Sequence, residues 1–259
     1  MPEQNLLLKE NLKLLRLPTM KAEYAKLAAE AADKGIGYEA YLLMLSECEL
    51  SERQAKAIER RIRAARFGVL KDFDSYDFSA VPALSKPAVF GLGSGEWISK
   101  HENACLIGSP GTGKTHLATA LGLAACRKRM SVRFITAASL VSQLEEAQEQ
   151  YRLEKLCAKL DKADLLIIDE LGYLTFAKSG ADLLFRLFAD RYERGSILVT
   201  SNLAFADWVH VFKDERMTAA LLDRFTHRCH IFEMNGESYR FKQSVKAKGR
   251  LRKSKQEKS

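Results

Sequence analysis

The sequence predicts an α/β fold, in which a parallel sheet lies between layers of helices, preceded by a small all-helical module. From about residue 103 onward, short apolar segments alternate with helix-like segments, which is the pattern of a parallel sheet covered on both faces. Before residue 67, leucines and alanines recur at helical spacing among strong helix formers. We therefore expect a helical domain over residues 1–67, an α/β domain over 68–242 and a basic, disordered tail over 243–259.

Four helices are expected in the N-terminal module. Pro18 ends the first of them, and Lys34-Gly35 is a suitable stop for the second. Ser51 is interpreted as the cap of the fourth helix. The predicted ranges are 6–17, 19–32, 38–49 and 51–67.

One face of the expected fourth helix is cationic. Arg53, Lys56, Arg60 and Arg63 fall on one helical stripe, whereas alanines and isoleucines fall on another. A solvated charged face is the alternative, but acids usually intersperse on such a face, and only two glutamates do so here. We interpret the stripe as a contact to DNA phosphates.

The α/β domain is expected to begin with a linker. Residues 67–99 are rich in glycine, proline and aromatic residues, which favours a linker that leads into the domain. Strands are then predicted over 104–107, 132–135, 165–168, 197–201 and 229–232. Helices are predicted over 114–130, over 138–160 in two pieces, over 180–193 and over 217–225.

A phosphate-binding loop stands between the first strand and the helix that follows it. The spacing G-x-x-x-x-G-K-[ST] ends in Gly113-Lys114-Thr115, and its glycines let successive N–H groups curl around a phosphate at the positive end of a helix. Lys114 is expected to reach the β- and γ-phosphates of ATP, and Thr115 to offer its hydroxyl to Mg²⁺. The expected nucleotide contacts are Gly108, Ser109, Pro110, Gly111, Thr112, Gly113, Lys114, Thr115 and His116.

Polar residues follow the next strands of the expected sheet. Asp169 and Glu170 end an apolar strand, where Asp169 could bind Mg²⁺ through water and Glu170 could orient or deprotonate the attacking water. Asn202 closes the following strand and is a candidate for positioning the same water. Such residues also begin ordinary loops and turns, but beside a phosphate-binding loop they predict ATP hydrolysis.

Arg224 is a candidate for completing a neighbour's site. It lies at the end of the predicted helix over 217–225 and could contact the γ-phosphate held by an adjacent subunit, the alternative being an ordinary surface arginine. His227 and His230 alternate at a strand start with no second pair, and the five cysteines are scattered singly. We therefore expect neither a zinc site nor a disulfide framework.

Hydropathy argues against a membrane partner, and the charge of the C-terminal residues suggests an anionic one. No apolar run approaches the ~20 residues that span a bilayer, and the N-terminus lacks the apolar stretch of a signal peptide. We expect a soluble cytoplasmic protein with no membrane partner. The formal net charge is +8, and residues 240–259 alone hold nine Lys or Arg and one acid. This tail is either a non-specific contact to a phosphate backbone or a solubilising end.

Several longer runs carry a family resemblance. They are Asp-Glu-Leu-Gly-Tyr at 169–173, Asp-Arg-Tyr-Glu-Arg-Gly-Ser at 190–196, Thr-Ser-Asn-Leu at 200–203, Leu-Asp-Arg at 222–224 and Gly-Glu-Ser-Tyr-Arg at 236–240. With the phosphate-binding loop, these runs resemble the IstB family, the ATP-binding transposition helpers of bacterial insertion sequences. The match runs from about residue 50 to residue 242. IstB is similar to the helicase loader DnaC, and both belong to the initiator branch of the AAA+ ATPases.

The resemblance implies a five-stranded AAA+ core and two further roles. Residues 138–160 would be the extra helix of the initiator branch, which helps to build helical assemblies. Arg224 would act in trans, so that the active form is a homo-oligomer, and Arg240 would touch the nucleotide. Because the sequence continues for few residues after Arg240, we expect no full C-terminal helical lid, the element that usually carries this residue in AAA+ proteins.

In function, the resemblance implies an ATP-dependent helper of DNA transposition. Such a helper oligomerises on duplex DNA and bends it, recruits and stimulates the partner transposase, and is dismantled by ATP hydrolysis. One alternative is a DnaC-like replicative helicase loader that binds single-stranded DNA, and another is a nucleotide-binding module with little turnover. Phe73, Tyr76 and Phe78 lie where the linker could fold over the base.

Overall fold

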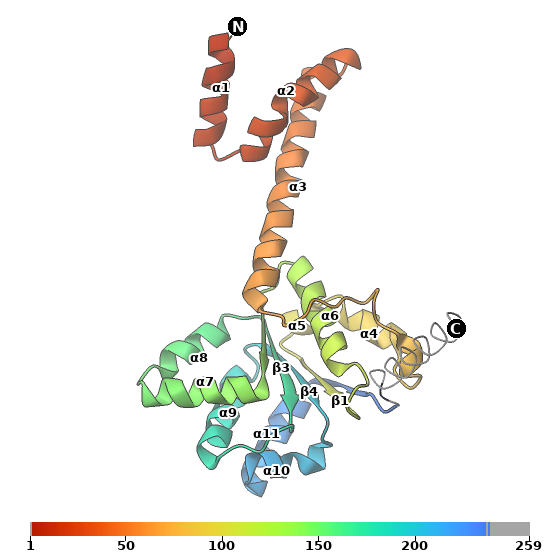
Figure 1. Ribbon diagram of the computed structural model, residues 1–259, viewed down its shortest axis with the longest axis vertical. Helices are drawn as coiled ribbons and strands as arrows, with labels where there is room; N and C mark the ends of the chain where they lie inside the picture. The colour runs from red at the N-terminus through yellow and green to blue at the C-terminus, as the bar shows by residue number, and fades with distance from the viewer. Residues whose placement is uncertain (1, 237, 239–259) are drawn as a thin grey trace, which may run out of the picture. The chain divides into compact units, whose positions relative to one another are not determined.

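The computed structural model describes residues 2–236 and residue 238 (Figure 1). The chain forms two compact units, residues 1–60 and residues 61–259. Ile62, Ala65 and Phe67 pack with the hydrophobic core of the second unit.

The N-terminal unit is built from helices. They are α1 (Pro2–Leu14), α2 (Pro18–Asp33) and the greater part of α3 (Tyr38–Ala65). Since α3 is one continuous helix of 28 residues, the prediction of separate third and fourth helices was wrong. Ser51 lies inside α3 because neither glycine nor proline interrupts this segment, and its neighbours are mostly strong helix formers.

A buried carboxylate ties α2 to α3. Oε2 of Glu49 accepts hydrogen bonds from the backbone N–H groups of Thr19, at 2.8 Å, and Met20, at 3.0 Å. Leu17 precedes α2 and offers no capping side chain, so Glu49 satisfies the free N–H groups of that helix end. Burial alone would raise the pKa of Glu49, but these donors and Arg53 outweigh it and hold the pKa below its usual value.

The second unit contains a five-stranded parallel sheet in the order β2-β3-β4-β1-β5. The parallel sheet and each of its strands are confirmed to within a few residues. The strands are β1 (Asn103–Ile107), β2 (Val132–Thr136), β3 (Leu165–Leu171), β4 (Ser196–Ser201) and β5 (Cys229–Glu233).

Helices cover both faces of this sheet (Figure 1). Along β3, Leu165 and Ile167 pack into one hydrophobic core, whereas Leu166 and Ile168 pack into the other. The first core is closed by α4 (Lys86–Leu92), α5 (Glu96–Ser99), α6 (Lys114–Arg127) and the end of α3. The second is closed by α7 (Ala137–Glu149), α8 (Leu153–Asp161), α9 (Lys178–Arg191), η2 (Phe205–Trp208), α10 (Val209–Phe212) and α11 (Glu215–Thr226).

Residues 67–99 are part of the second unit's core, so their prediction as a linker was wrong. They form the short helix η1 (Phe78–Ala80), α4 and α5. Val81, Val89 and Trp97 are almost fully buried. These helices are too short to show a helical period, and their glycines and prolines concealed the apolar residues that pack between them.

None of the described helices is long and apolar enough to cross a membrane.

Candidate nucleotide-binding site

The loop between β1 and α6 has a backbone that only glycine suits. Gly111 and Gly113 have φ angles of +81° and +93°, in the left-handed region that favours glycine. A Cβ atom at Gly108 would lie 2.1 Å from the carbonyl oxygen of Met234. The helix α6 begins at Lys114, so its free N–H groups face the loop. The loop is therefore shaped to hold an anionic phosphate.

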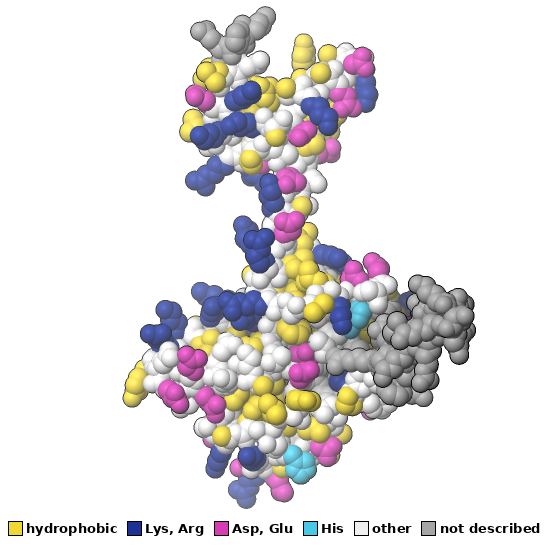
Figure 2. Space-filling model, in the orientation of Figure 1, with side chains coloured by type: hydrophobic (Ala, Val, Ile, Leu, Met, Phe, Trp, Pro, Cys, Tyr) yellow, Lys and Arg dark blue, Asp and Glu magenta, His cyan; other side chains and the backbone are white. Residues whose placement is uncertain are grey.

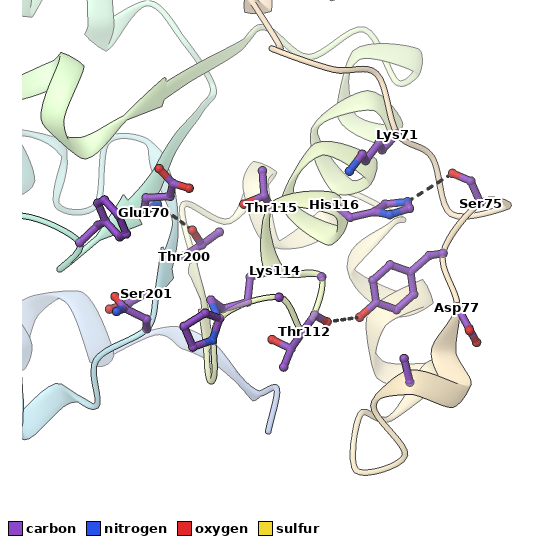
Figure 3. A pocket seen from close by; sticks show the side chains of 17 residues that line it. Lys71, Ser75, Asp77, Thr112, Lys114, Thr115, His116, Glu170, Thr200 and Ser201 are labelled. Atoms are coloured by element: carbon purple, nitrogen blue, oxygen red, sulfur yellow. Dashed lines mark hydrogen bonds between the residues drawn. The ribbon is translucent and has the colours of Figure 1, made fainter. Parts of the chain in front are cut away.

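A cavity of about 320 Å³ opens over this loop (Figure 3). Three parts of the second unit line it: the loop and the start of α6, the segment from Lys71 to the end of η1, and the ends of β3 and β4. The lining residues are 110–116, Lys71, Ser75, Tyr76, Asp77, Ala80, Glu170, Tyr173, Thr200, Ser201 and Asn202.

Lys114 lies over the loop. Its Nζ donates hydrogen bonds to the carbonyl oxygens of Gly108, at 2.6 Å, and Ser109, at 2.8 Å. The hydroxyl of Thr112 also donates to the Ser109 carbonyl, at 2.9 Å. These bonds order the loop and keep the ammonium group at the phosphate-binding concavity.

Asp169 is buried beside the start of α6. Its Oδ1 accepts hydrogen bonds from the hydroxyls of Thr115, at 3.0 Å, and Thr200, at 2.6 Å. Burial raises the pKa of Asp169, and these two hydrogen bonds offset only part of that effect. The Thr115 hydroxyl and the Asp169 carboxylate are the oxygen ligands that Mg²⁺ prefers, so these residues fit a magnesium ion beside bound phosphates.

A β-bulge re-aims the residue after Asp169. Ile168 pairs with Val199 and Leu171 with Ser201, so two residues of β3 stand opposite Thr200 alone. Glu170 has a φ of +62°, and its N–H donates to the Thr200 hydroxyl at 2.9 Å (Figure 3). In a regular strand, successive side chains point to opposite faces. The bulge instead places Glu170 in the cavity wall while Asp169 contacts Thr115.

Tyr76 forms part of the cavity wall next to the loop. Its ring lies edge-on to the His116 ring, with centroids 5.1 Å apart, and its hydroxyl is 3.4 Å from the Thr112 carbonyl. Burial raises the pKa of Tyr76 to about 12, so this side chain stays neutral at physiological pH. His116 Nε2 lies 2.8 Å from the carbonyl oxygen of Asp72, which fixes the segment against α6. Tyr76 is thus held beside the phosphate-binding loop.

Of the other predicted site residues, one lines the cavity and the rest do not or lie outside the described residues. Asn202 lines the cavity directly after β4. Arg224 is exposed on α11, with its guanidinium 6.0 Å from the centroid of Phe185, and is not among the cavity-lining residues. Phe73 and Phe78 pack against Phe90 and do not line the cavity. Arg240 and the basic tail lie outside the described residues.

The cationic stripe of α3 is exposed, but two of its members have carboxylate partners. Arg53 Nε donates to Glu49 at 2.7 Å, and its guanidinium also donates to the carbonyl of Arg16. Lys56 lies 3.1 Å from Glu52. Arg60 and Arg63 are exposed and form no ion pair with a described carboxylate.

The motifs did not identify every residue around the cavity. Lys71, Ser75, Asp77 and Tyr173 line it without belonging to the predicted site. Thr200 was recognised as part of a strand end, but its bridge to Asp169 and Glu170 depends on the pairing of β3 with β4. Only the strand order could have indicated this bridge.

The fold and the site together define the class of protein. A phosphate-binding loop, an acidic strand end and a polar neighbouring strand end, on a parallel sheet of this order, make the chain a P-loop ATPase of the AAA+ class. The chain belongs to the family of IstB-like ATP binding proteins, whose model matches residues 10–247.

Relatives of this family come from several bacteria. An insertion sequence ATP-binding protein of Sinorhizobium fredii is 42% identical over 90% of this chain and 79% of its own length. The ATP-binding protein of IS5376 from Geobacillus stearothermophilus is 37% identical, over 88% and 91%. The ATP-binding protein of IS21 from Pseudomonas aeruginosa is 36% identical, over 90% and 88%. The chain is accordingly an ATP-binding protein of the insertion-sequence type.

Solved structures share the fold at low sequence identity. AMPPCP-bound DnaA from Aquifex aeolicus has a TM-score of 0.55 and 19% identity, covering 65% of this chain and 51% of DnaA. DnaI has a TM-score of 0.52 and 17% identity, covering 65% of this chain and 89% of DnaI. The predicted AAA+ fold is therefore confirmed.

Proposed function

We propose that this protein is an ATP-dependent helper of DNA transposition. It assembles on target duplex DNA and bends it, recruits and stimulates the transposase of the same element, and comes apart when ATP is hydrolysed. The main support for ATP dependence is that Asp169 accepts hydrogen bonds from both Thr115 and Thr200 beside the phosphate-binding loop. Membership of the IstB-like family supports the transposition part.

Each residue has a task in the proposed hydrolysis. The loop N–H groups and Lys114 bind the phosphates, and Thr115 with Asp169 would hold Mg²⁺, which would neutralise negative charge on the phosphates. Glu170 orients and deprotonates the attacking water, and Asn202 fixes that water beside the γ-phosphate. Lys114, Glu170 and Asn202 act within one subunit.

The remaining group is supplied by a second subunit. Arg224 is exposed on α11 and outside the cavity lining, which suits an arginine that contacts a neighbour's γ-phosphate. ATP bound between subunits would then stabilise the assembly, and hydrolysis would release it. Arg240 is proposed to touch the nucleotide as well.

The test combines ATP turnover with imaging. Turnover that rises on addition of duplex DNA and is lost in Glu170→Gln would support the proposal and exclude a binding module without turnover. Electron microscopy with ATP and a duplex of about 50 base pairs should show curved filaments or rings around bent DNA. Binding only to single strands or to a helicase would instead support a helicase loader and overturn the helper function.

A further inference from the structure

A groove on the ATPase unit is lined by cations. It has a volume of about 240 Å³ and lies where the end of α3, the start of β2 and the end of α8 meet. Its charged lining residues are Arg66, Arg133, Lys159 and Lys162, and no acid of the described chain lines it. This groove is separate from the nucleotide cavity, with which it shares no lining residue.

A second hollow continues the groove along α7 and α8. It has a volume of about 290 Å³ and shares Gln143, Leu156 and Lys159 with the first. The second hollow adds the cations Arg152 and Lys155 and a single acid, Glu146. We call the two together the cationic groove.

Local packing brings two arginines together in the cationic groove. The rings of Phe67 and Phe134 are in contact, with centroids 5.8 Å apart, and so hold the chain after α3 against β2. Arg66 and Arg133 directly precede these phenylalanines. Burial lowers the pKa of the Arg133 guanidinium, and the positive charge of Arg66 lowers it further. The two like charges repel each other, and an anion between them would relieve that repulsion.

Helix α8 separates its charges onto different sides. Arg152, Lys155, Lys159 and Lys162 recur at spacings of three and four residues, which places them on one face as mutually repelling neighbours. The acids of α8 are engaged elsewhere, since Glu154 pairs with Arg186 at 2.6 Å and Asp161 lies 3.9 Å from Arg191.

The cations of the groove are available to a partner. None of the six forms an ion pair with a carboxylate in the part of the chain that the structure describes. Figure 2 shows Lys and Arg side chains gathered over the region of α8 on the face in view. Protein surfaces usually mix both signs of charge, so this segregation indicates an anionic partner.

We propose that the cationic groove binds the phosphate backbone of duplex DNA. This inference rests on the proposed function and assigns DNA contacts to the ATPase unit, in addition to those proposed for α3. From Arg152 to Lys162 the cationic face extends about 15 Å at 1.5 Å per residue, a length over which a duplex presents many phosphates. Exposed lysines that are not held in place by buried polar groups are suited to contacts with DNA phosphates. Such contacts do not distinguish one base sequence from another.

The test removes charge from the groove and measures the salt dependence of DNA binding. Lys155, Lys159 and Lys162 are changed together to Gln, and the affinity for a fluorescent duplex of about 50 base pairs is measured with a non-hydrolysable ATP analogue at about 50–200 mM salt. Affinity should fall about tenfold or more, and the slope of log affinity against log salt should become shallower by about two to three.

Two matched variants test whether the effect depends on the charge of these lysines and on their position in the groove. Changing the same three lysines to Arg keeps the charge and should preserve the slope. Changing the exposed Lys100, Lys178 and Lys213 to Gln removes equal charge outside the groove and should also preserve it. Arg66→Gln with Arg133→Gln provides a second groove variant, which should reproduce the shallower slope, and thermal midpoints verify that each variant is folded.

The outcomes separate this inference from the proposed function. Wild-type protein that binds duplex while the groove variants keep its slope would overturn the groove assignment alone. Groove variants that bind duplex normally but no longer respond to the transposase would also overturn it, in favour of an acidic protein partner. Wild-type protein without affinity for duplex would overturn both.

Discussion

The hydroxyl of Thr200 accepts a hydrogen bond from the backbone N–H of Glu170 at 2.9 Å. The same hydroxyl donates to Asp169 at 2.6 Å, so one buried side chain joins the two carboxylate residues of the site. Because the β-bulge leaves the Glu170 N–H without a ladder partner, the Thr200 oxygen replaces that partner and stabilises a φ of +62°.

We therefore expect Thr200→Val to lose turnover while keeping nucleotide affinity. Valine has nearly the same shape but offers no oxygen to the Glu170 N–H, so the carboxylate proposed to activate water would lose its fixed position. The kcat for ATP hydrolysis should fall about 10- to 100-fold, whereas KM should stay within about threefold. Thr200→Ser retains the hydroxyl and should recover most of the activity. A valine variant with normal kcat would show that the bridge does not position Glu170.

The wall formed by Tyr76 leads to a second prediction. Its ring packs against His116 and would meet a Cβ atom at Gly113 at 2.9 Å, whereas its hydroxyl bond to Thr112 is long, at 3.4 Å. Packing should therefore matter more than the hydroxyl. Tyr76→Ala should weaken ATP binding about tenfold or more, and Tyr76→Phe should bind within about twofold of wild type, as measured by a fluorescent ATP analogue. Equal losses in both variants would contradict this.

Sequence reasoning identified the parts of this site that are local in the chain. The glycine spacing around Lys114 and the two acids near the end of β3 depend on neighbouring residues, and the structure has the loop before α6 and the strand end at these positions. Thr200 and Lys71 line the same cavity as the loop around Lys114 but lie far from this loop along the chain. Only the tertiary structure brings them to the cavity. The short helices α4 and α5 were missed for a related reason, since their formation depends on burial rather than on a periodic pattern.

Glu49 should make the N-terminal unit sensitive to acid. A carboxyl whose pKa is lower in the folded than in the unfolded protein stabilises the fold at pH above the unfolded value, and this contribution is lost as the pH falls through the folded value. The ordinary pKa of this group is 4.5. Hydrogen-exchange protection of the α2 amides should therefore be full near neutral pH and should decrease as the pH is lowered below about 4.5.

Glu49→Gln is the matched variant for that prediction. The amide is similar in size but cannot supply a charge to Arg53 or to the helix end. We expect the N-terminal unit to lose about 1–3 kcal/mol at neutral pH and its acid sensitivity to diminish. Glu52→Gln changes an exposed carboxylate of the same helix and should have little effect. A Glu49→Gln variant with wild-type protection would refute the capping role.

The stripe on α3 can be tested without disturbing this cap. Arg53 is bonded to Glu49 and Arg16, so replacing it would combine loss of charge with loss of stability. Lys56, Arg60 and Arg63 changed together to Gln avoid that problem. If they contact phosphates, the slope of log affinity against log salt for duplex DNA should become shallower by about two to three. An unchanged slope would leave the stripe as a solvated helix face.

Mixing two inactive variants tests whether Arg224 completes a neighbour's site. In the proposed mechanism, Arg224→Ala keeps an intact cavity but would supply no arginine, whereas Glu170→Gln supplies the arginine but would lack the carboxylate proposed to activate water. Each alone should hydrolyse ATP slowly. In a one-to-one mixture that exchanges subunits at random, about a quarter of the interfaces would join an intact cavity to an intact arginine. Turnover with duplex DNA should therefore rise well above that of either variant alone. If Arg224 acted within its own subunit, or only stabilised α11 against Phe185, no mixture could exceed the average of the two separate activities.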